Sequence, residues 1–373
     1  MLQNTLIMKK YKIGILGAGS IARAMAWTAG QMENTVAYAV ASRSMDKARA
    51  FAENHNVERA YGSYEEMLDD PEVDLVYIAT PHSHHYEHAR MCIERGKSVL
   101  CEKAFTANLR QAEALLRLAH ERKVFITEAI WTRYMPFTKT INAMVNDGTI
   151  GTPMTLTAHL SYPITHKERI RRPELAGGAL LDIGLYNINF ALMAFGTDIS
   201  EISSAVIKSD EGMDFQDSIT FKYADGKMAA LQCNVFCAGD RQGIVCGDKG
   251  YFIVDNINNP QRADIYSADH KLVRTVSCPP QITGYEYEVQ ACIDALEHGR
   301  LECEDMPHSE TLRVMGLLDS LRMEWGVRYP MDDWMTRKCD VIVNIAERRQ
   351  RTDAITGVRP LMFINRHILY VEN

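Results

Sequence analysis

A glycine-rich turn near the N-terminus constrains this chain more than any other feature. The turn reads GAGSIA at residues 17–22, between an apolar run at 12–16 and a segment with helical spacing at 20–32. In the pattern G-x-G-x-x-G/A the first glycine permits a tight turn, the second lets the backbone approach a pyrophosphate, and the helix N-terminus offers N–H groups to phosphates. A turn without a ligand is the alternative, but the flanking strand and helix favour a dinucleotide site. The residues expected at the cofactor here are Gly17, Gly19, Ser20 and Ile21.

Strand and helix patterns alternate through the first 128 residues. Short apolar runs predict buried strands at residues 12–16, 36–41, 75–79, 98–101 and 124–127. Helical spacing lies between them at residues 20–32, 47–54, 84–95 and 108–123, and Ser63 with Glu66 has the form of a capping box for another short helix. Strands separated by helices imply a parallel sheet. We therefore predict an α/β domain over residues 1–128, with the doubly wound sheet of a Rossmann fold.

The pattern changes after residue 128, where strand-like runs follow one another. These runs lie at residues 155–160, 202–207, 218–223, 228–235, 251–254 and 272–276. A helix is expected at 182–195, and two more at 286–298 and 309–325. Successive strands predict an α+β domain at residues 129–330, built on an open, mostly antiparallel sheet. Residues 331–373, with a strand-like run at 367–371, are expected to form a C-terminal extension of unknown role.

Charge and composition exclude several classes of function. The chain carries 41 Lys and Arg against 48 Asp and Glu, a net charge of −7, so nothing attracts it to nucleic acid or an anionic membrane. No apolar run approaches the roughly 20 residues of a membrane span, and the N-terminus lacks the order of a signal peptide. The nine cysteines form no C-x-x-C pair, which suits reduced thiols. We expect a cytoplasmic enzyme with a small-molecule substrate and no nucleic-acid or membrane partner.

The end of the second strand bears on the choice of cofactor. An acidic residue there would bind the ribose hydroxyls of NAD. This chain has Ser42 and Arg43 instead, which could accept the 2′-phosphate of NADP through charge and hydrogen bonds. A solvated arginine is the alternative. The sequence predicts that NADP is preferred, with NAD still possible.

Polar residues follow the next two strong strands, at the edge where doubly wound sheets bind ligands. Four histidines lie within residues 82–88, and two of them, His84 and His88, would share a helix face as metal ligands can. No cysteine or carboxylate nearby completes such a site, so no metal is expected. Lys103 follows the strand at 98–101, where a neighbouring nicotinamide cation would lower its pKa toward neutrality. A surface pair with Glu102 is the alternative.

Several motifs in register resemble those of the Gfo/Idh/MocA oxidoreductases. They are GAGSIA, ATPHSHHYEHA, GKSVLCEKAF, EAIWTRYMP and GGALLDIGLYNINF, and the resemblance covers about residues 11–330. The most similar branch is that of the dimeric dihydrodiol dehydrogenases and NADP-dependent xylose and glucose dehydrogenases. Such a resemblance implies a Rossmann domain followed by an open sheet.

The resemblance also implies roles for particular residues. Lys103 stands at the catalytic lysine of the E-K-P motif, although Ala104 replaces the proline. Asp182 and Tyr186 match the D-x-x-x-H/Y motif as catalytic and substrate-binding residues, whereas their spacing alone would allow a helix N-cap and a core tyrosine. Trp131 matches an aromatic residue of the substrate pocket. The residues implied to contact the cofactor are Thr80, Pro81, His82, His85, Glu102, Lys103, Trp131 and Arg133.

These expectations define an enzyme that transfers a hydride between NAD(P) and a secondary alcohol or ketone of a sugar, polyol or small diol. Tyr186 is favoured as the general acid/base, with Lys103 lowering its pKa, and the reverse assignment stays open. One alternative is a non-catalytic regulator that binds a dinucleotide. Another is an enzyme that recycles a tightly held cofactor. An open sheet face would expose apolar area, so a homo-oligomer is expected.

Overall fold

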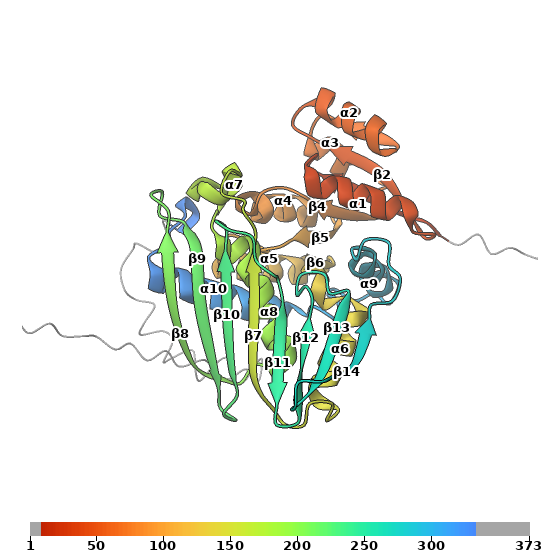
Figure 1. The fold of residues 1–373 in the computed structure, drawn as a ribbon. Helices are drawn as coiled ribbons and strands as arrows, with labels where there is room; N and C mark the ends of the chain where they lie inside the picture. The colour runs from red at the N-terminus through yellow and green to blue at the C-terminus, as the bar shows by residue number, and fades with distance from the viewer. Residues whose placement is uncertain (1–8, 333–373) are drawn as a thin grey trace, which may run out of the picture.

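The computed structural model describes residues 9–332, which form two sheets with associated helices (Figure 1). The first sheet has the order β3-β2-β1-β4-β5-β6, and all its strand pairs are parallel. Its strands are β1 (Tyr11–Leu16), β2 (Thr35–Ala41), β3 (Arg59–Tyr61), β4 (Leu75–Ile78), β5 (Ser98–Glu102) and β6 (Ile126–Ala129). The chain changes direction across the sheet between β1 and β4, which opens a crevice at their carboxyl ends.

Five helices connect these strands: α1 (Ser20–Gln31), α2 (Met45–His55), α3 (Tyr64–Leu68), α4 (His82–Glu94) and α5 (Leu109–Arg122). Polar side chains fix where several begin. Ser63 accepts a hydrogen bond from the Glu66 amide at 3.2 Å, as the capping box predicts, and Asn108 accepts one from the Gln111 amide at 3.0 Å. The predicted Rossmann-type sheet is confirmed, with one short strand, β3, that the sequence did not indicate.

The second sheet has eight strands in the order β14-β13-β12-β11-β7-β10-β9-β8. Every adjacent pair is antiparallel except β7 with β10. Its strands are β7 (Pro153–Ser161), β8 (Ile199–Lys208), β9 (Asp214–Tyr223), β10 (Met228–Asn234), β11 (Gly243–Gly247), β12 (Gly250–Val254), β13 (Arg262–Ser267) and β14 (Leu272–Ser277). The prediction of a mostly antiparallel second sheet is confirmed.

Among the described residues, helices cover one face of this sheet and leave the other open. They include α6 (Pro136–Asn146), α8 (Leu185–Phe195) and α10 (His308–Trp325), which lie behind it in Figure 1, while α9 (Glu286–Glu297) lies beside the first sheet. Along β10, buried and exposed residues alternate, as expected for a sheet with one solvated face. Residues Pro173–Phe195 are long and apolar enough to span a membrane. However, 94% of the apolar 18-residue window within them is buried inside the protein, so this segment belongs to the core.

A buried carboxylic acid on β9 makes the stability of this domain depend on pH. Asp217 accepts a hydrogen bond from the Cys233 thiol at 2.7 Å, and its other carboxyl oxygen has no partner among the described residues. Burial, then the charge of Asp214, raises its pKa from 3.8 to about 8. The folded protein therefore holds this proton more tightly than the unfolded chain does. The contribution of Asp217 to stability is complete below pH 4 and is lost as the pH rises toward 8.

Replacing Asp217 with asparagine, which stays neutral, removes this pH dependence. Relative to wild type, we expect the free energy of unfolding of Asp217→Asn to rise by on the order of 1–3 kcal/mol between pH 5 and pH 8. Urea denaturation at both pH values measures the difference. The same change at Asp210, which is exposed, is the control. An equal offset from wild type at the two pH values would contradict the prediction.

Candidate active site

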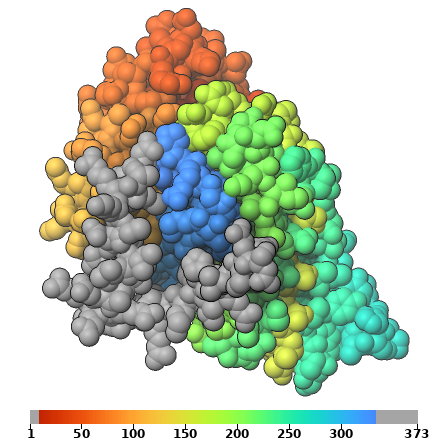
Figure 2. All heavy atoms as spheres, turned by 90° about the vertical axis from the view of Figure 1, so that its left-hand side faces the viewer, coloured from red at the N-terminus to blue at the C-terminus, as the bar shows by residue number. Residues whose placement is uncertain are grey.

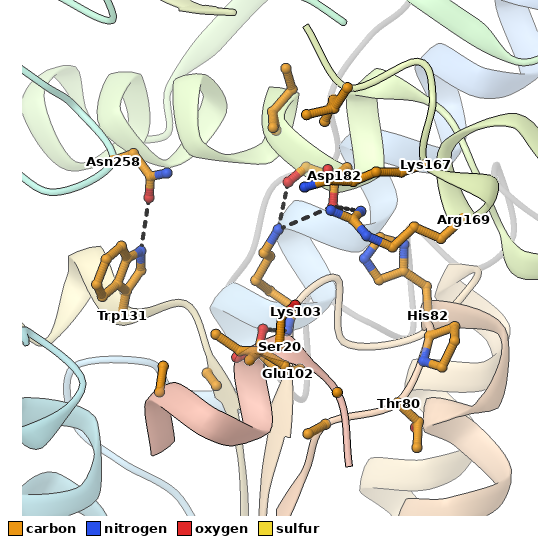
Figure 3. Close-up of a pocket in the computed structure, with 18 of the residues that line it drawn as sticks. Ser20, Thr80, His82, Glu102, Lys103, Trp131, Lys167, Arg169, Asp182 and Asn258 are labelled. Carbon is orange, nitrogen blue, oxygen red and sulfur yellow. Dashed lines mark hydrogen bonds and ion pairs between the residues drawn. The ribbon is translucent and has the colours of Figure 1, made fainter. Parts of the chain in front are cut away.

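A cavity of about 630 Å³ lies where the carboxyl ends of the first sheet's strands meet the second domain (Figure 3). It contains most of the residues predicted from sequence. Those in its wall are Gly19, Ser20, Ile21, Thr80, Pro81, His82, Glu102, Lys103, Trp131, Asp182 and Tyr186. The predicted residues outside the wall are Gly17, Ser42, Arg43, His85 and Arg133.

The glycine-rich turn fits a dinucleotide. Gly17 has φ +109°, and a Cβ there would lie 3.0 Å from the carbonyl oxygen of Ala79, so only glycine suits this position. A Cβ on Gly19 would meet nothing within 4 Å, which leaves room above the backbone for a phosphate group. The first N–H groups of α1 follow directly, at Ser20 and Ile21. These are the features that a pyrophosphate requires.

Lys103, at the end of β5, reaches across to the second domain. Its Nζ donates a hydrogen bond to the main-chain oxygen of Asp182 at 2.5 Å and lies 3.6 Å from the Asp182 carboxylate. Arg169 pairs with the same carboxylate. The Lys103 side chain is 14% exposed, so it is not the surface pair considered from sequence. The peptide bond between Lys103 and Ala104 is cis.

The electrostatics of this cluster keep Asp182 ionised. Burial alone would raise the pKa of Asp182, but the charges of Lys103 and Arg169 outweigh burial and hold the pKa well below its usual range. Asp182 lies in a wide, π-type turn at Leu180–Gly184, before α8, and its side chain does not cap that helix. The N-cap alternative therefore does not apply.

Tyr186 follows in the first turn of α8 and faces the lysine. The Lys103 ammonium lies 5.0 Å from the centre of the Tyr186 ring, and no hydrogen bond to the Tyr186 hydroxyl occurs within residues 9–332. Burial, then the charge of Glu102, raises the pKa of Tyr186 well above 10.0. The pKa of Tyr186 is thus raised, whereas the sequence led us to expect that Lys103 would lower it. In this state Tyr186 is a neutral phenol that can donate a proton.

Glu102 and the histidines support the loops around the lysine. Glu102 accepts hydrogen bonds from the Tyr77 hydroxyl and, at 3.2 Å, from the Lys103 amide, and burial raises its pKa. His82 lines the cavity, and burial lowers its pKa to about 3, so its ring is neutral. Its Nδ1 lies 3.2 Å from the Ala176 carbonyl oxygen, which leaves Nε2 as an acceptor.

Other predicted residues lie away from the cavity and make different contacts. His85 is fully buried, with its ring nitrogens each 2.8 Å from the carbonyl oxygens of Thr80 and Ala104. Arg133 donates to Asn189 at 2.6 Å and Glu310 at 3.2 Å. His84 and His88 stack on one another, and residues 9–332 contain no group of three potential metal ligands.

Several residues of the cavity wall, including those around Trp131, were not predicted from the sequence. The Trp131 indole donates a hydrogen bond to Asn258 at 2.9 Å, and the Asn258 amide donates to the Tyr162 hydroxyl at 3.3 Å. The Trp131 ring stacks on Tyr285, with centroids 4.2 Å apart. Lys167 points into the cavity near Asp182 (Figure 3). A dense run of charges at residues 166–172 could have drawn attention to Lys167 and Arg169, but nothing local marks Asn258 or Tyr285.

Comparison with known proteins identifies the family. Residues 11–129 match the Gfo/Idh/MocA oxidoreductase family with its NAD-binding Rossmann fold, and residues 138–253 match the Gfo/Idh/MocA C-terminal domain. A trans-1,2-dihydrobenzene-1,2-diol dehydrogenase from Xenopus tropicalis is 31% identical over 78% of this chain and 90% of that protein. The chain belongs to the Gfo/Idh/MocA oxidoreductase family. The predicted family and the predicted NAD(P)-dependent oxidoreductase activity are thereby confirmed.

Further similar proteins extend the comparison. The trans-1,2-dihydrobenzene-1,2-diol dehydrogenase of Homo sapiens is 31% identical over 86% of this chain and 98% of that protein. A 3-ketoreductase from Actinomadura kijaniata, solved with NADP and TDP-benzene, is 25% identical, with a TM-score of 0.75 over 84% of this chain and 98% of the other. An aldose–aldose oxidoreductase from Caulobacter crescentus, at 19% identity and a TM-score of 0.77 over 84% of this chain and 97% of that one, shares the fold.

Proposed function

We propose that this protein is an NADP-dependent oxidoreductase that interconverts a secondary alcohol and a ketone on a sugar, polyol or small diol. The observation that carries the proposal is the convergence of Lys103, Asp182 and Tyr186 in one cavity beside the glycine-rich turn. When bound, the dinucleotide supplies or accepts the hydride. Gly17, Gly19, Ser20 and Ile21 would hold its pyrophosphate, and Thr80, Pro81 and His82 would border it.

The residues of the chain manage the proton. In ketone reduction, the neutral Tyr186 phenol donates its proton to the substrate oxygen as that oxygen gains negative charge. The Lys103 ammonium stabilises the resulting tyrosinate and returns a proton to it, and the lysine then regains a proton from solvent. Asp182 holds Lys103 in place, and alcohol oxidation runs the same steps in reverse. Lys103 as the direct donor is the competing assignment, because the two groups titrate as a pair.

The cavity wall suits a hydroxylated substrate. The stacked rings of Trp131 and Tyr285 form a flat apolar surface, while Asn258 and Tyr162 place polar groups beside it. A sugar or diol ring offers matching faces, with C–H groups on one side and hydroxyls at its rim. The relatives that are named for a diol or a ketone substrate support the same class.

A substrate screen tests the activity. Purified enzyme is incubated with NADPH and ketones or diketones of sugars, and with NADP⁺ and D-xylose, D-glucose or a trans-dihydrodiol, while absorbance at the nicotinamide band is followed. We expect turnover with at least one alcohol–ketone pair. Absence of turnover with the whole panel would favour a dinucleotide-binding regulator. Cofactor retained through purification would favour internal recycling of the nicotinamide.

The preference for NADP depends on Arg43. This side chain is exposed just beyond β2, and Ser42 beside it is buried, so a 2′-phosphate at this edge would meet the guanidinium. We expect Arg43→Ala to weaken NADPH binding about 10- to 100-fold while NADH binding changes little, since only NADPH carries that phosphate. Fluorescence titration measures both, with Arg49→Ala on α2 as the control. Tighter binding of NADH by wild type would overturn the preference.

We also propose a cytoplasmic homo-oligomer that assembles through the open face of the second sheet. Ile207 on β8 and Met228 on β10 lie on this face, opposite the exposed residues Gln216 and Lys222 of β9, and are 55% and 46% exposed. Exposed apolar side chains on a broad sheet favour burial against another subunit. A monomeric mass in sedimentation would remove this part of the proposal.

A further inference from the structure

Residues 177–180 lead into the π-type turn that contains Asp182, and three hydrogen bonds to other parts of the chain hold them in place. The Gly178 amide donates to the Ile170 carbonyl at 2.9 Å. The Leu180 amide donates to the carboxylate of Asp214 at 2.6 Å. The Tyr329 hydroxyl donates to the carbonyl oxygen of Gly177 at 2.6 Å. Residues 177–180 are therefore tied to the preceding short helix α7 (Glu168–Arg171), to β9 and to the chain beyond α10.

This segment has no room to shift. A Cβ on Gly177 would lie 2.5 Å from the carbonyl oxygen of Ile170. Gly178 has φ +108°, and a Cβ there would lie 2.1 Å from the Asp214 carboxylate. Only glycine is compatible with either position, and the close approach lets the Asp214 side chain reach the backbone. Asp214 itself is fully buried.

Tyr329 is in turn fixed by a buried ionic network. Its ring, 2% exposed, lies 4.2 Å from the Arg322 guanidinium, and its amide donates to Asp332 at 2.9 Å. Asp332 also accepts hydrogen bonds from Arg322 at 2.9 Å and from Asn108, the N-cap of α5, at 3.0 Å. In Figure 2 the blue atoms, which belong to the last described part of the chain, border both the orange atoms of the first domain and the green atoms of the second. The network thus connects both domains to Tyr329.

The position of residues 177–182 affects the reaction because Lys103 contacts Asp182 in the turn. Lys103 donates to the main-chain oxygen of Asp182 at 2.5 Å, in addition to its ion pair with the side chain. Whatever fixes the backbone at residue 182 therefore also fixes the lysine ammonium. The backbone at 182 follows directly from the segment that Tyr329 and Asp214 hold.

We infer that Tyr329, together with Asp214, is a positioning residue that sets the place of the Lys103 ammonium through the backbone of the 177–182 segment. The inference rests on the proposed catalytic role of Lys103. Tyr329 does not line the cavity and makes its hydrogen bonds to Gly177 and Asp332 rather than to Lys103, so its effect on the reaction passes through the turn. This role is distinct from the roles of the residues that line the cavity.

Tyr329→Phe tests the inference, because it removes only the hydroxyl that holds the Gly177 carbonyl. With NADP⁺ and the alcohol that gives the highest turnover in the substrate screen, we expect kcat to fall about three- to tenfold, with KM and NADPH affinity unchanged. Amide hydrogen exchange in residues 177–186 should become faster. The matched control is Tyr223→Phe, which removes another buried hydroxyl that donates to a backbone carbonyl, that of Ala191, from the far end of β9.

A double-mutant cycle separates positioning from general weakening of the fold. If Tyr329 acts through Lys103, Tyr329→Phe should lower kcat in wild type but not in the Lys103→Met background, measured there in single turnovers. Equal effects in the two backgrounds, or no effect of Tyr329→Phe alone, would overturn the inference. Full activity of Lys103→Met would instead overturn the proposed function, so the two failures are distinguishable.

Discussion

Replacing Lys103 with methionine is expected to lower kcat about a thousandfold while leaving NADPH affinity within a factor of about three. The methionine keeps the length and apolar character of the side chain but removes the ammonium that, in the proposed mechanism, stabilises the tyrosinate. A loss of this size corresponds to about 4 kcal/mol of transition-state stabilisation. Steady-state kinetics with the best substrate of the screen, and fluorescence titration of NADPH, measure the two quantities.

Two further variants test whether the loss is specific to Lys103 and whether Lys103 acts together with Tyr186. Lys139→Met removes an exposed lysine that pairs with Asp305, and it should leave kcat unchanged. Tyr186→Phe should lower kcat to a similar extent as Lys103→Met, with little further loss in the double variant, because residues that act as a unit are not additive. Turnover of Lys103→Met near that of wild type, with NADPH still bound, would refute the proton-transfer role.

Replacing Arg322 with methionine is expected to destabilise the protein by about 3–5 kcal/mol. Arg322 is 1% exposed and pairs with Asp319 at 2.6 Å and Asp332 at 2.9 Å. Removing the guanidinium leaves two carboxylates buried without their cation, and it also removes the group that packs over Tyr329. Urea denaturation followed by tryptophan fluorescence and circular dichroism measures the change.

An exposed arginine provides the control for this prediction. Arg300 pairs with Glu304 at 2.6 Å, but its side chain is 42% exposed, so Arg300→Met should cost less than about 1 kcal/mol. A similarly small cost for Arg322→Met would show that the buried network contributes little to folding. A large cost would show that the network contributes strongly to folding.

The elements with strong periodicity were predictable from the sequence. The strand–helix alternation of the first 128 residues and the capping of α3 by Ser63 depend on local signals, and the structure contains both. Strands β11 and β13 were missed, since β11 begins and ends with glycine and β13 carries Arg262 and Asp264. Helix α6 was also missed. The helix expected at 182–195 begins instead as a π-type turn, a feature that spacing does not reveal.

Some residues of the candidate site were also predictable from the sequence, and others were not. Lys103, Asp182 and Tyr186 belong to motifs that can be recognised in the chain, and the fold brings them together. Asn258 and Tyr285 enter the cavity only through tertiary packing, from a loop after β12 and from the start of α9. Arg169 lies within a run of charges in which only the folded structure distinguishes the one residue that pairs with Asp182.

The two halves of the cavity come from different domains, so they can change separately during evolution. The residues beside the glycine-rich turn follow strands of the first sheet, whereas Tyr162, Ile164 and Asn258 lie in loops beyond strands of the second. Loops tolerate replacement far better than the strands that carry them. A lineage built on this plan can keep the half beside the glycine-rich turn and exchange the loops of the other. The similar proteins that are named a diol dehydrogenase and a 3-ketoreductase accord with such a history.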